Sequence, residues 1–453
     1  MRPFWQATVP PRDQHPPLTT RIEADLAIVG GGFTGLWAAL YAKELQPGRR
    51  VVVLEATSCG DGASSRNGGF LQASVTHGLG NGLTRFPEEI EQLERISLRN
   101  FADLQADLER YGVDSEFEVS GALDVALTPH EFEELKEGAA EAHAYGHVVE
   151  LLDRDQMQAE VHSPLYHGGL LDKTGAALVN PAKLVDGLRL AAIRSGVEIF
   201  EYTPVRKLEN TSSGVRAATN AGVVDAARTL IATSAYPPLL KQIKQYIAPV
   251  YDYALMTEPL SAAQMASIGW ERRAGIGDLA NQFHYYRLSA DNRILFGGYD
   301  AVYRYGGPVG PQLDDHDATF ARLSQHFFIT FPQLDGLRFT HRWGGAIDTC
   351  SRFSVFFGRA LKGRGVYALG YTGLGVGASR FGARTALDLL DGRDTEATET
   401  RLARSRPLPF PPEPLRSGVI QLTRNRLAAA DRNDGRRGLW LRTLDRAGLG
   451  FDS

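Results

Sequence analysis

The sequence has little cysteine and no long apolar run, and both absences exclude classes of protein. Two cysteines in 453 residues, Cys59 and Cys350, cannot form a disulfide framework and show no metal-ligand spacing. The eleven histidines are scattered along the chain, and we expect no metal. No apolar run approaches the roughly 20 residues that a transmembrane helix needs. Residues 1–17 are rich in proline and charge and lack the apolar core of a secretory signal, so we expect a cytoplasmic protein that binds no membrane.

An excess of charge of either sign is also missing. The formal net charge of −4 is close to neutral for this length and gives no argument for nucleic acid as a partner. The hydrophobic fraction of 43% is typical of a soluble globular protein. A chain of 453 residues is long enough for two domains that share a large core.

Residues 25–55 carry the pattern around which the chain is organised. A short apolar run at 25–29 leads into the glycine-rich turn 30–35, which is followed by an apolar-periodic run to residue 45. A second apolar run at 51–54 ends on Glu55. Strand, glycine turn, helix, strand and acid, in this order, predict the βαβ unit of a dinucleotide-binding fold.

Each residue type in this unit has a physical task. Gly30 permits the tight turn out of the strand, Gly32 lets a pyrophosphate approach the backbone, and Gly35 allows close packing of helix on sheet. The helix N-terminus offers free N–H groups and a positive dipole end to the phosphates. Glu55 lies 20 residues past Gly35, where a carboxylate can accept both ribose hydroxyls of an adenosine.

The segment 60–71 follows this acid directly and is small, polar and rich in glycine. Its hydroxyls and backbone N–H groups suit phosphate, and its glycines permit close approach to a flat ring. An ordinary surface loop has a similar composition, so the residues alone leave that alternative open.

Four motifs together resemble the D-amino acid oxidase superfamily of FAD-dependent flavoenzymes. They are GASSRNGGFL at 62–71, FHYYRLSADNRILFGG at 283–298, HRWGG at 341–345 and GYTGLGVGASRFGA at 370–383. The resemblance covers about residues 25–390 and is greatest to the branch that holds gamma-glutamylputrescine oxidase. It implies that FAD is held by Gly30, Gly32, Phe33, Thr34, Gly35, Glu55, Ala56, Ala63, Ser64, Ser65, Arg66, Asn67, Gly68, Gly69, Phe70, Leu71, Val205, Thr233, Gly373, Leu374, Gly375 and Val376.

The expected fold is α/β, α+β overall, with a Rossmann-like FAD-binding domain and an inserted antiparallel-sheet substrate domain. We assign residues 1–85 (with an N-terminal arm), 161–248 and 341–400 to the FAD-binding domain, and residues 86–160 and 249–340 to the substrate domain. Residues 401–453 form a C-terminal tail rich in proline and arginine. Its interleaved acidic residues favour helices docked on their own protein over a basic surface for a membrane or partner.

Turns and periodicity give several local expectations. Residues 3–17 are expected to run over the surface as an extended arm, because the four prolines between residues 10 and 17 forbid a regular helix. The apolar spacing in 87–111 predicts a helix that Gly112 ends. Residues 167–177 are typical of a β-hairpin, and residues 77–84 of a glycine-rich connector or lid.

Candidates for the substrate site come from two of the motifs. Tyr285 and Arg287 alternate with Tyr286 on an expected strand and therefore share one face. An aromatic ring beside a guanidinium suits an amine whose far end carries a carboxylate, although a packing pair with a surface arginine has the same spacing. Trp343 is the third candidate, over the flavin or in the core.

The resemblance implies FAD-dependent oxidation of a carbon–nitrogen bond. Hydride leaves the carbon beside nitrogen in a small-molecule amine or amino acid, and the imine product hydrolyses to a carbonyl compound. The segment 373–376 supplies N–H donors at a helix N-terminus for the charge that develops on the flavin. We name no side-chain base, because hydride loss from a neutral amine needs none.

Two departures from the family pattern bear on this chemistry. Gly345 stands where sarcosine-oxidase relatives attach flavin through a cysteine, so we expect noncovalent FAD. Residues 293–299 contain no lysine, which those relatives carry near the site of dioxygen reaction, so dioxygen and another electron acceptor both stay open. The alternatives are a flavin dehydrogenase, an NAD-dependent dehydrogenase and a non-catalytic flavoprotein. An NAD enzyme would leave the segments 63–71 and 370–377 without a task.

Overall fold

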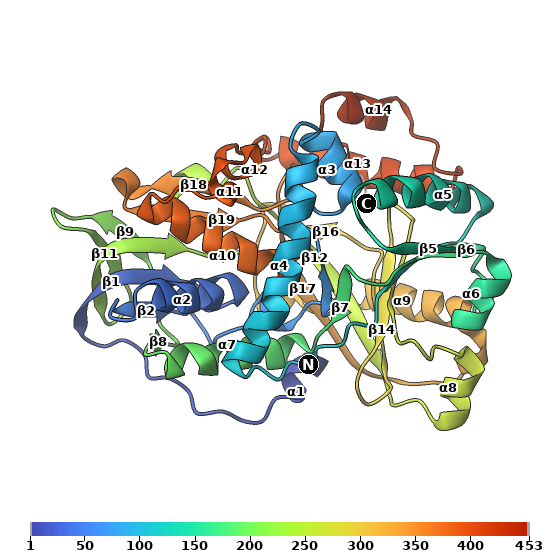
Figure 1. Ribbon diagram of the computed structural model, residues 1–453, viewed down its shortest axis with the longest axis horizontal. Helices are drawn as coiled ribbons and strands as arrows, with labels where there is room; N and C mark the ends of the chain where they lie inside the picture. Colours follow the sequence, from blue (N-terminus) through green and yellow to red (C-terminus); the bar gives the residue numbers. More distant parts are fainter. Residues whose placement is uncertain (1, 451–453) are drawn as a thin grey trace.

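The computed structural model describes residues 2–450, which fold around two large β-sheets lying side by side (Figure 1). The nucleotide-binding sheet has the order β18, β19, β11, β1, β2, β8; off this order, β10 pairs with β11, and β9 pairs with β10. Its strands are β1 (Arg21–Val29), β2 (Val51–Leu54), β8 (Glu198–Phe200), β9 (Lys207–Asn210), β10 (Val215–Ala218), β11 (Val223–Ile231), β18 (Phe356–Ala360) and β19 (Gly365–Leu369). The neighbours β19, β11, β1, β2 and β8 run parallel, as the dinucleotide-binding pattern predicts.

Four helices bury one face of this sheet. They are α2 (Phe33–Leu45), α4 (Ile90–Tyr111), α7 (Pro181–Arg194) and α10 (Gly375–Asp391). Leu26 and Ile28 of β1 share one buried cluster with these helices, whereas the intervening Ala27 belongs to a cluster on the opposite face. The alternation follows from the period of two along a strand, and it fixes which face receives the helices.

Helix α4 corrects one domain assignment. The predicted helix is present, and Gly112 ends it in the left-handed conformation at φ 61°. Its residues Leu93, Ile96 and Leu104, however, pack in the core of the nucleotide-binding sheet rather than in the substrate domain. The assignment of residues 86–160 to the substrate domain therefore begins too early. The apolar stripe of α4 predicts that the helix is buried, but it does not indicate against which sheet.

The second sheet, which we call the substrate sheet, has the order β16, β12, β15, β14, β13, β4, β6, β5, and β17 pairs with β12. Its strands are β4 (Ala122–Ala126), β5 (Val149–Leu152), β6 (Gly168–Asp172), β12 (Ala248–Thr257), β13 (Gly275–Asp278), β14 (His284–Leu288), β15 (Ile294–Gly298), β16 (Val302–Tyr303) and β17 (Phe339–Thr349). β17 stays in this sheet to Thr349, so the expected boundary at residue 340 lies too early as well. The sheet is mostly antiparallel, as expected for the inserted domain.

The outer face of the substrate sheet packs against helices that are distinct from those of the first sheet. They are α6 (Arg154–Glu160), α8 (Ala262–Ile268) and α9 (Asp317–Thr330). Helix α5 (Pro129–Ala144) lies on the opposite face, because its Phe132 meets Gly168 of β6 whereas Met157 of α6 meets the next residue, Gly169. Tyr253 and Leu255 of β12 share a buried cluster with Phe320 and Phe327 of α9. Because side chains alternate along β12, its other residues face inward, toward the nucleotide-binding domain.

The hairpin expected at 167–177 does not form. β7 (Ala176–Leu178) pairs antiparallel with β3 (Phe70–Gln72), and β6 pairs with β4 and β5 instead. The turn residues were recognised correctly, but β7 pairs with a strand more than 100 residues earlier in the chain. This two-stranded ribbon ties the end of the segment 60–71 to the chain between the two domains.

The N-terminal arm is more ordered and more buried than its prolines suggested. Helix α1 (Phe4–Ala7) precedes the prolines, which therefore do not interrupt it. Trp5 is fully buried, in a cluster with Ala254, Met256 and Trp343 on the inner side of the substrate sheet. The expected surface arm is thus wrong for residues 4–5, since the anchor is a single tryptophan rather than a periodic pattern.

The glycine-rich connector and the tail contain further helices, which are α3 (Leu79–Arg85), α11 (Glu396–Glu399), α12 (Arg401–Arg404), α13 (Leu415–Asp431) and α14 (Leu439–Arg446). The described chain also contains the 3-10 helices η1 (Ala63–Ser65), η2 (Lys241–Ile243), η3 (Pro311–Leu313), η4 (Pro332–Leu334) and η5 (Leu361–Gly363). No helix between residues 2 and 450 is long and apolar enough to cross a bilayer.

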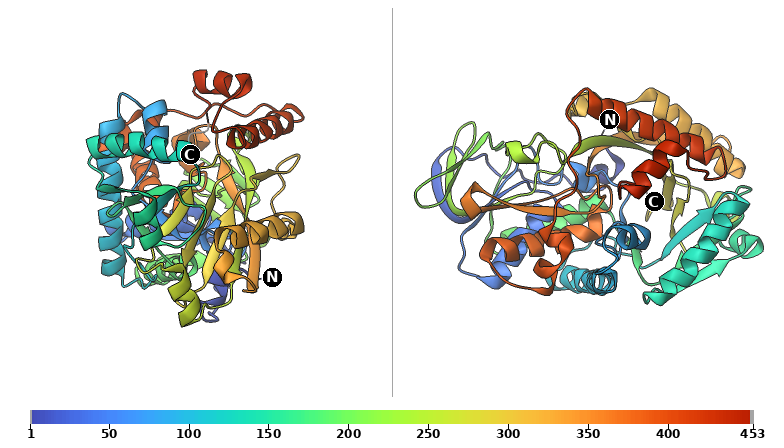
Figure 2. Two further views of the ribbon diagram at one scale, coloured as in Figure 1. Left: turned by 90° about the vertical axis from the view of Figure 1, so that its right-hand side faces the viewer. Right: turned by 90° about the horizontal axis from the view of Figure 1, so that it is seen from above.

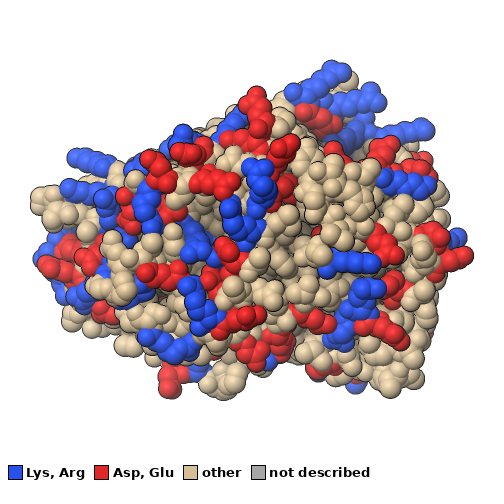
Figure 3. All heavy atoms as spheres, viewed as in Figure 1, with Lys and Arg blue, Asp and Glu red and all other residues tan. Residues whose placement is uncertain are grey.

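Helices α13 and α14 lie over the substrate domain when the molecule is seen from above (Figure 2), whereas α12 packs against β18 of the first sheet. Asp431 at the end of α13 accepts hydrogen bonds from the backbone N–H groups of Asn281 (2.9 Å) and Gln282 (3.1 Å). Arg85 of α3 donates to the backbone of Gly448 and Gly450. Basic side chains nevertheless gather on the outer surface near α14 (Figure 3). The tail is therefore docked on its own protein, as its mixed charge favoured.

Candidate active site

The turn from β1 into α2 has the geometry that its glycines predicted. Gly30 adopts φ 110°, and a Cβ at this position would lie 2.3 Å from the carbonyl oxygen of Ala232. A Cβ on Gly35 would lie 1.9 Å from the carbonyl oxygen of Gly30, so only glycine permits this approach of helix to strand. The conformation and the close packing therefore both require glycine at these two positions.

The N-terminus of α2 is open toward the flavin loop, by which we mean residues 60–71. Ser64 of that loop accepts a hydrogen bond from the backbone N–H of Phe33 at 3.0 Å, and its Oγ lies 2.8 Å from where a Cβ on Gly32 would stand. No side chain caps the helix through its N-cap residue, Gly32. Helix dipole, free N–H groups and a serine hydroxyl thus meet where a pyrophosphate would bind.

Glu55 lies at the end of β2, beside this turn. Its carboxylate accepts hydrogen bonds from the N–H of Gly31 at 2.7 Å and of Thr57 at 2.9 Å, and burial raises its pKa. The N–H of Thr203 donates to the carbonyl of Glu55 at 2.7 Å, which brings the partly exposed Val205 to the same end of the sheet. Ala56, next to Glu55, is exposed. This end of the sheet suits an adenosine.

Thr233 completes the first half of the site. Thr233 lies two residues after the end of β11, and the residue between them, Ala232, contacts Gly30. The backbone N of Thr233 would lie 3.6 Å from a Cβ on Gly30. The hydroxyl of Thr233 is buried and has no partner among the described residues. A buried hydroxyl without a partner costs free energy. It is therefore ready for a ligand that lies in the glycine turn.

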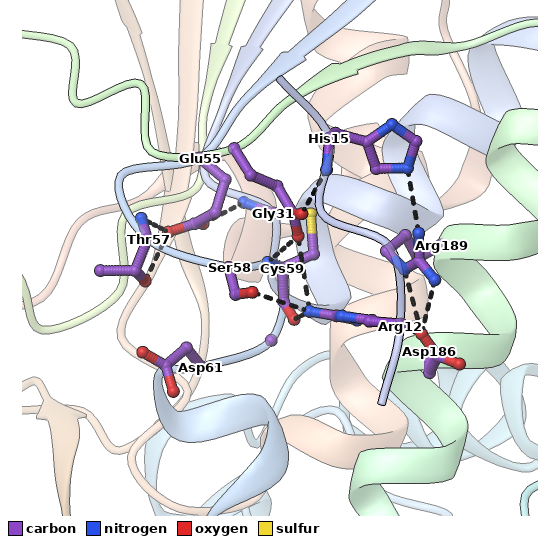
Figure 4. Close-up of polar contacts among 12 residues, drawn as sticks. Arg12, His15, Gly31, Glu55, Thr57, Ser58, Cys59, Asp61, Asp186 and Arg189 are labelled. Carbon is purple, nitrogen blue, oxygen red and sulfur yellow. Dashed lines mark hydrogen bonds and ion pairs between the residues drawn. The ribbon is translucent and has the colours of Figure 1, made fainter. Parts of the chain in front are cut away.

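A polar network that the sequence did not reveal holds the loop after β2 (Figure 4). Arg12 of the N-terminal arm donates to the carbonyl of Cys59 at 2.8 Å and pairs with Asp186 of α7 at 3.0 Å. The fully buried Glu201 accepts hydrogen bonds from the N–H of Cys59 at 2.7 Å and of His15 at 3.0 Å. Neither arginine nor glutamate shows a local motif, because their partners are distant in sequence.

The flavin loop is braced by its own side chains. Asn67 donates to the carbonyls of Ala63 (3.0 Å) and Ser64 (3.1 Å) and accepts from the N–H of Gly69 at 2.9 Å. The hydroxyl of Ser65 donates to Gly60 at 2.6 Å. These bonds fix the loop before Phe70 and Leu71 enter β3, and they give a physical reason for the serines and asparagine of the motif.

Two tryptophans from distant parts of the chain bond adjacent carbonyls of this loop. Trp343 of β17 donates its indole N–H to the carbonyl of Arg66 at 2.8 Å. Trp5 of α1 donates to the carbonyl of Asn67 at 3.0 Å. Trp343, a candidate for the substrate wall, is only 2% exposed. Its geometry favours a support of the flavin loop over an open wall.

The closing segment 370–377 reaches the same site from the other side. Thr34 of α2 donates to the hydroxyl of Tyr371 at 2.9 Å, and a Cβ on Gly377 would lie 2.9 Å from the carbonyl of Gln72. Gly373 is exposed, and Leu374 precedes the first turn of α10, which has no side-chain cap. Gly375 and Val376 are the first helical residues. Their N–H groups are available to a ligand.

Asp348 of β17 was not recognised in the sequence, yet it shapes this segment. Its carboxylate accepts a hydrogen bond from the N–H of Gly370 at 2.7 Å, and burial raises its pKa to about 6. Cys350 lies beside it, with its thiol donating to the carbonyls of Ser354 and Gly370, each at 3.3 Å. A buried aspartate in a strand has no sequence signature that separates it from a surface aspartate.

Tyr285, Arg287 and Tyr286 alternate on β14 as predicted. Tyr286 points into the outer core, whereas Tyr285 and Arg287 face the flavin loop. The guanidinium of Arg287 donates from Nη1 to Val179 at 2.7 Å and to Gly69 at 3.2 Å, and burial lowers its pKa to about 10. Because Arg287 is 2% exposed, this geometry favours a support of the loop over a carboxylate anchor.

The residues present fit FAD. The glycine turn and the N-terminus of α2 suit a pyrophosphate, Glu55 suits a ribose, and the unpartnered hydroxyl of Thr233 lies between them. The flavin loop and the closing segment, contributed by residues more than 300 apart, meet beyond the pyrophosphate end. A dinucleotide with a flat second ring system fills both halves, whereas a nucleotide alone would use only the first.

Comparison with known proteins gives the same family. The family model described as DAO, FAD dependent oxidoreductase, matches residues 25–389. Gamma-glutamylputrescine oxidoreductase of Escherichia coli is 32% identical over 380 residues, which cover 83% of this chain and 85% of that protein. Probable oxidoreductase OrdL of Haemophilus influenzae is 30% identical over 389 residues, with 84% and 86% covered.

Solved structures share the fold. Glycine oxidase from Geobacillus kaustophilus superposes with a TM-score of 0.68 at 20% identity, over 82% of this chain and 96% of that one. L-proline dehydrogenase from P. horikoshii gives a TM-score of 0.67 at 18% identity, over 85% and 96%. These likenesses establish the fold. The chain belongs to the D-amino acid oxidase (DAO) family of FAD dependent oxidoreductases.

Proposed function

We propose that this protein oxidises the carbon–nitrogen bond of a small-molecule amine or amino acid, with FAD as its hydride acceptor. The observation that carries the proposal is the convergence of the glycine turn, the flavin loop and the closing segment beside the inner face of the substrate sheet. Two hydrogen bonds connect them, from the N–H of Phe33 to Ser64 and from Thr34 to Tyr371. An inserted sheet next to a dinucleotide site is where a substrate would meet the cofactor.

Bound FAD supplies the redox chemistry, and the residues of this chain supply position and electrostatics. The N-terminus of α10 places N–H donors and a positive dipole end where negative charge would accumulate. Asp348 holds Gly370 and so fixes the approach to that helix. Asn67 and the two buried tryptophans hold the flavin loop. The task of the protein is thus to keep the carbon that loses hydride in line with the cofactor and away from bulk water.

The names of the relatives support an amine or amino acid as the substrate. One relative is named for gamma-glutamylputrescine and others for glycine, and both compounds carry a carbon–nitrogen bond that can lose hydride. The product would be an imine, which hydrolyses in water to a carbonyl compound and an amine or ammonia. The proposal extends this class of reaction to the present chain.

We propose that FAD is held noncovalently. Gly345 has no side chain, and a Cβ there would lie 3.4 Å from Cβ of Arg66 in the flavin loop. Cys350 is fully buried with its thiol bonded to two carbonyls, and burial raises its pKa, so it is a poor nucleophile. Within residues 2–450, Cys59 is the other thiol, and it is also buried.

The electron acceptor is dioxygen or another acceptor. β15, which lacks the lysine of sarcosine-oxidase relatives, is buried along its whole length and carries Ile294, Leu295 and Phe296. No charged side chain of this strand faces the cofactor site to attract a reduced oxygen species. This feature supports a flavin dehydrogenase as a second candidate, with the same reductive chemistry.

The experiment is a spectrum of the purified protein, followed by reduction under nitrogen with a panel of amines and amino acids. Flavin absorbance that one or more members bleach, and that alcohols do not, supports the proposal. Gly32→Val should lose both colour and activity, because its side chain would enter the space next to Ser64. Gly48→Ala is the matched control, since a Cβ there meets nothing within 4 Å.

The two acceptors are separated by oxygen consumption. An oxidase consumes dioxygen at the rate at which the amine is oxidised, whereas a dehydrogenase needs an artificial acceptor dye to turn over. A protein that takes up no flavin even when FAD is added, or whose flavin no amine bleaches, would contradict the proposed function.

A further inference from the structure

Asp252 is a carboxylate on the inner face of the substrate sheet, and the chemistry above gives it no task. It lies on β12 between Tyr251 and Tyr253, both of which pack into the outer core. Alternation therefore turns Asp252 inward, on the same side as Ala254, whose cluster holds the two tryptophans that brace the flavin loop. Asp252 is partly exposed, whereas Tyr253 and Ala254 are buried.

The surroundings of Asp252 place it beside the flavin loop. Across the ladder it stands directly opposite Gly345 of β17, where a Cβ would lie in ordinary contact with Arg66, 3.4 Å from its Cβ. Tyr285, its neighbour from β14, packs edge-to-face on Phe70 with ring centroids 5.7 Å apart. Three elements thus meet at Asp252: the strands β17 and β14 of the substrate sheet, and the flavin loop.

A short hydrogen bond fixes the carboxylate. The hydroxyl of Tyr285 donates to Oδ2 of Asp252 at 2.5 Å, and the N–H of Tyr253 donates to Oδ1 at 2.8 Å. The ring of Tyr285 needs glycine on both sides, since a Cβ would lie 2.8 Å from it on Gly68 and 2.6 Å from it on Gly297. Tyr285 and Asp252 are therefore positioned as a unit. Each carboxylate oxygen already accepts one hydrogen bond, and the backbone of Gly298 is a further partner.

No cation of the described chain neutralises this carboxylate. Asp252 takes part in no ion pair within residues 2–450. Arg66 of the flavin loop and Arg287, which bonds that loop, already have partners. Arg66 pairs with Asp314 at 2.6 Å and donates to Gly344 at 3.2 Å, and Arg287 donates to the backbone. A desolvated carboxylate without a countercharge costs free energy that a cationic ligand would recover.

We propose that Asp252, oriented by Tyr285, binds a positively charged nitrogen of the substrate. This inference deepens the proposed function and rests on it: the substrate is an amine that enters with an ammonium group, loses one ammonium proton before hydride leaves the neutral amine, and needs no carboxylate. The rings of Phe70 and Tyr285 add aromatic surface around the cation. The guanidinium groups of Arg66 and Arg287, which could otherwise hold a substrate carboxylate, already bond other groups of the protein. Amino acids, whose carboxylate would approach Asp252, are disfavoured.

The test uses three probes of one shape that the enzyme cannot oxidise. tert-Butylammonium is a cation, tert-butanol is neutral and pivalate is an anion, and none has hydrogen on the carbon that carries its polar group. Hydride loss is therefore impossible, and binding is separated from turnover. Dissociation constants are measured on the flavin-loaded protein by saturation-transfer NMR and by perturbation of the flavin spectrum.

The flavin-loaded wild type should bind tert-butylammonium more tightly than tert-butanol and pivalate. Asp252→Asn should weaken the cation at least roughly tenfold, the loss expected for a charge-assisted bond, and leave tert-butanol unchanged. Glu258→Gln is the matched control, because Glu258 follows the same strand but pairs with Arg338 on the surface. This variant should bind all three probes as the wild type does.

A second variant guards against a failure of the first to fold. Tyr285→Phe keeps the ring and removes the hydroxyl that orients Asp252, and it should weaken the cation severalfold. Preference of the wild type for pivalate, no measurable binding of tert-butylammonium, or equal losses for cation and alcohol in both variants would overturn the proposal. Amine-dependent bleaching of the wild type would then still support the proposed function, so the two failures are distinguishable.

Discussion

Thr34 donates a hydrogen bond at 2.9 Å to the hydroxyl of Tyr371, 337 residues further along the chain. The bond joins the helix that would receive the pyrophosphate to the segment that would border the flavin. Both halves of the cofactor site are therefore coupled through one partly buried hydrogen bond. FAD should bind less tightly when this contact is lost, even though neither side chain needs to touch the isoalloxazine.

A double-mutant cycle tests this coupling. Tyr371→Phe and Thr34→Val should each lower the affinity for FAD by roughly 0.5–1.5 kcal/mol, the usual net value of a neutral hydrogen bond. The double variant should lose little more than either single one, since both remove the same bond. Titration of the apoprotein with FAD gives the three dissociation constants. Additive losses would show that the two residues act independently.

Glu55→Gln should weaken the retention of FAD while the fold stays intact. The carboxylate accepts from the N–H of Gly31 and would also accept ribose hydroxyls, and each charge-assisted bond is worth roughly 1.5–3 kcal/mol. The flavin content after extensive dialysis is the measurement. Glu23→Gln on the exposed part of β1 serves as the control. A full complement of flavin in Glu55→Gln would remove this residue from the ribose site.

Acid precipitation should release all of the flavin to the supernatant. Gly345 offers no atom for attachment, and the thiol of Cys350 is buried and bonded. Cys350→Ser should accordingly show the same release as the wild type. A pellet that stays yellow after thorough washing, with a colour that the serine variant lacks, would identify a covalent link instead.

Arg287→Lys separates a support of the flavin loop from a substrate anchor. Lysine cannot reproduce the planar donors that hold the carbonyls of Gly69 and Val179. The free energy of unfolding should therefore fall by roughly 1–3 kcal/mol, and the melting temperature and flavin retention should fall with it. Affinities for anionic and neutral amines should fall together. A loss confined to substrates with a carboxylate would restore the anchoring role that the sequence predicted for Arg287.

The binding of tert-butylammonium should depend on pH through Asp252. Burial raises the pKa of Asp252 to about 6, so its carboxylate is charged above this pH and neutral below it. Cation affinity should be full above pH 6 and fall about tenfold per unit below it, while an alkylammonium stays protonated. The hydroxyl of Tyr285, which bonds Asp252, does not titrate in this range, because burial holds its pKa well above the ordinary value. Asp252→Asn should abolish the dependence.

The sequence predicted best what depends on neighbours in the chain. Gly30 and Gly35 were identified because their roles are set within one βαβ unit. Gly112 was identified because it directly follows the apolar pattern of the helix that it ends. The alternation of Tyr285 and Tyr286 followed from the period of a strand alone. The flavin loop was found through its motif, although the bonds of Asn67 that stiffen it were visible only in the structure.

The sequence failed where the task depends on a distant partner. β7 looks like half of a local hairpin, and only the fold shows that it pairs with β3. Trp5 lies in a short segment without periodicity, so nothing indicated its burial. Asp252 and Asp348 are single acids in strands, and their significance comes from the desolvation and hydrogen bonds that other strands impose.

The paired tryptophans have a consequence for the order in which the molecule can be completed. Trp5 and Trp343 bond neighbouring carbonyls of one loop, yet 338 residues separate them in the chain. At typical rates of synthesis this interval lasts on the order of tens of seconds. Until β17 leaves the ribosome, the early tryptophan lacks its cluster and the loop keeps an unsatisfied carbonyl. Folding of the cofactor site must therefore conclude after translation of the closing strands, and a chain arrested before residue 343 should expose Trp5 to chaperones and proteases.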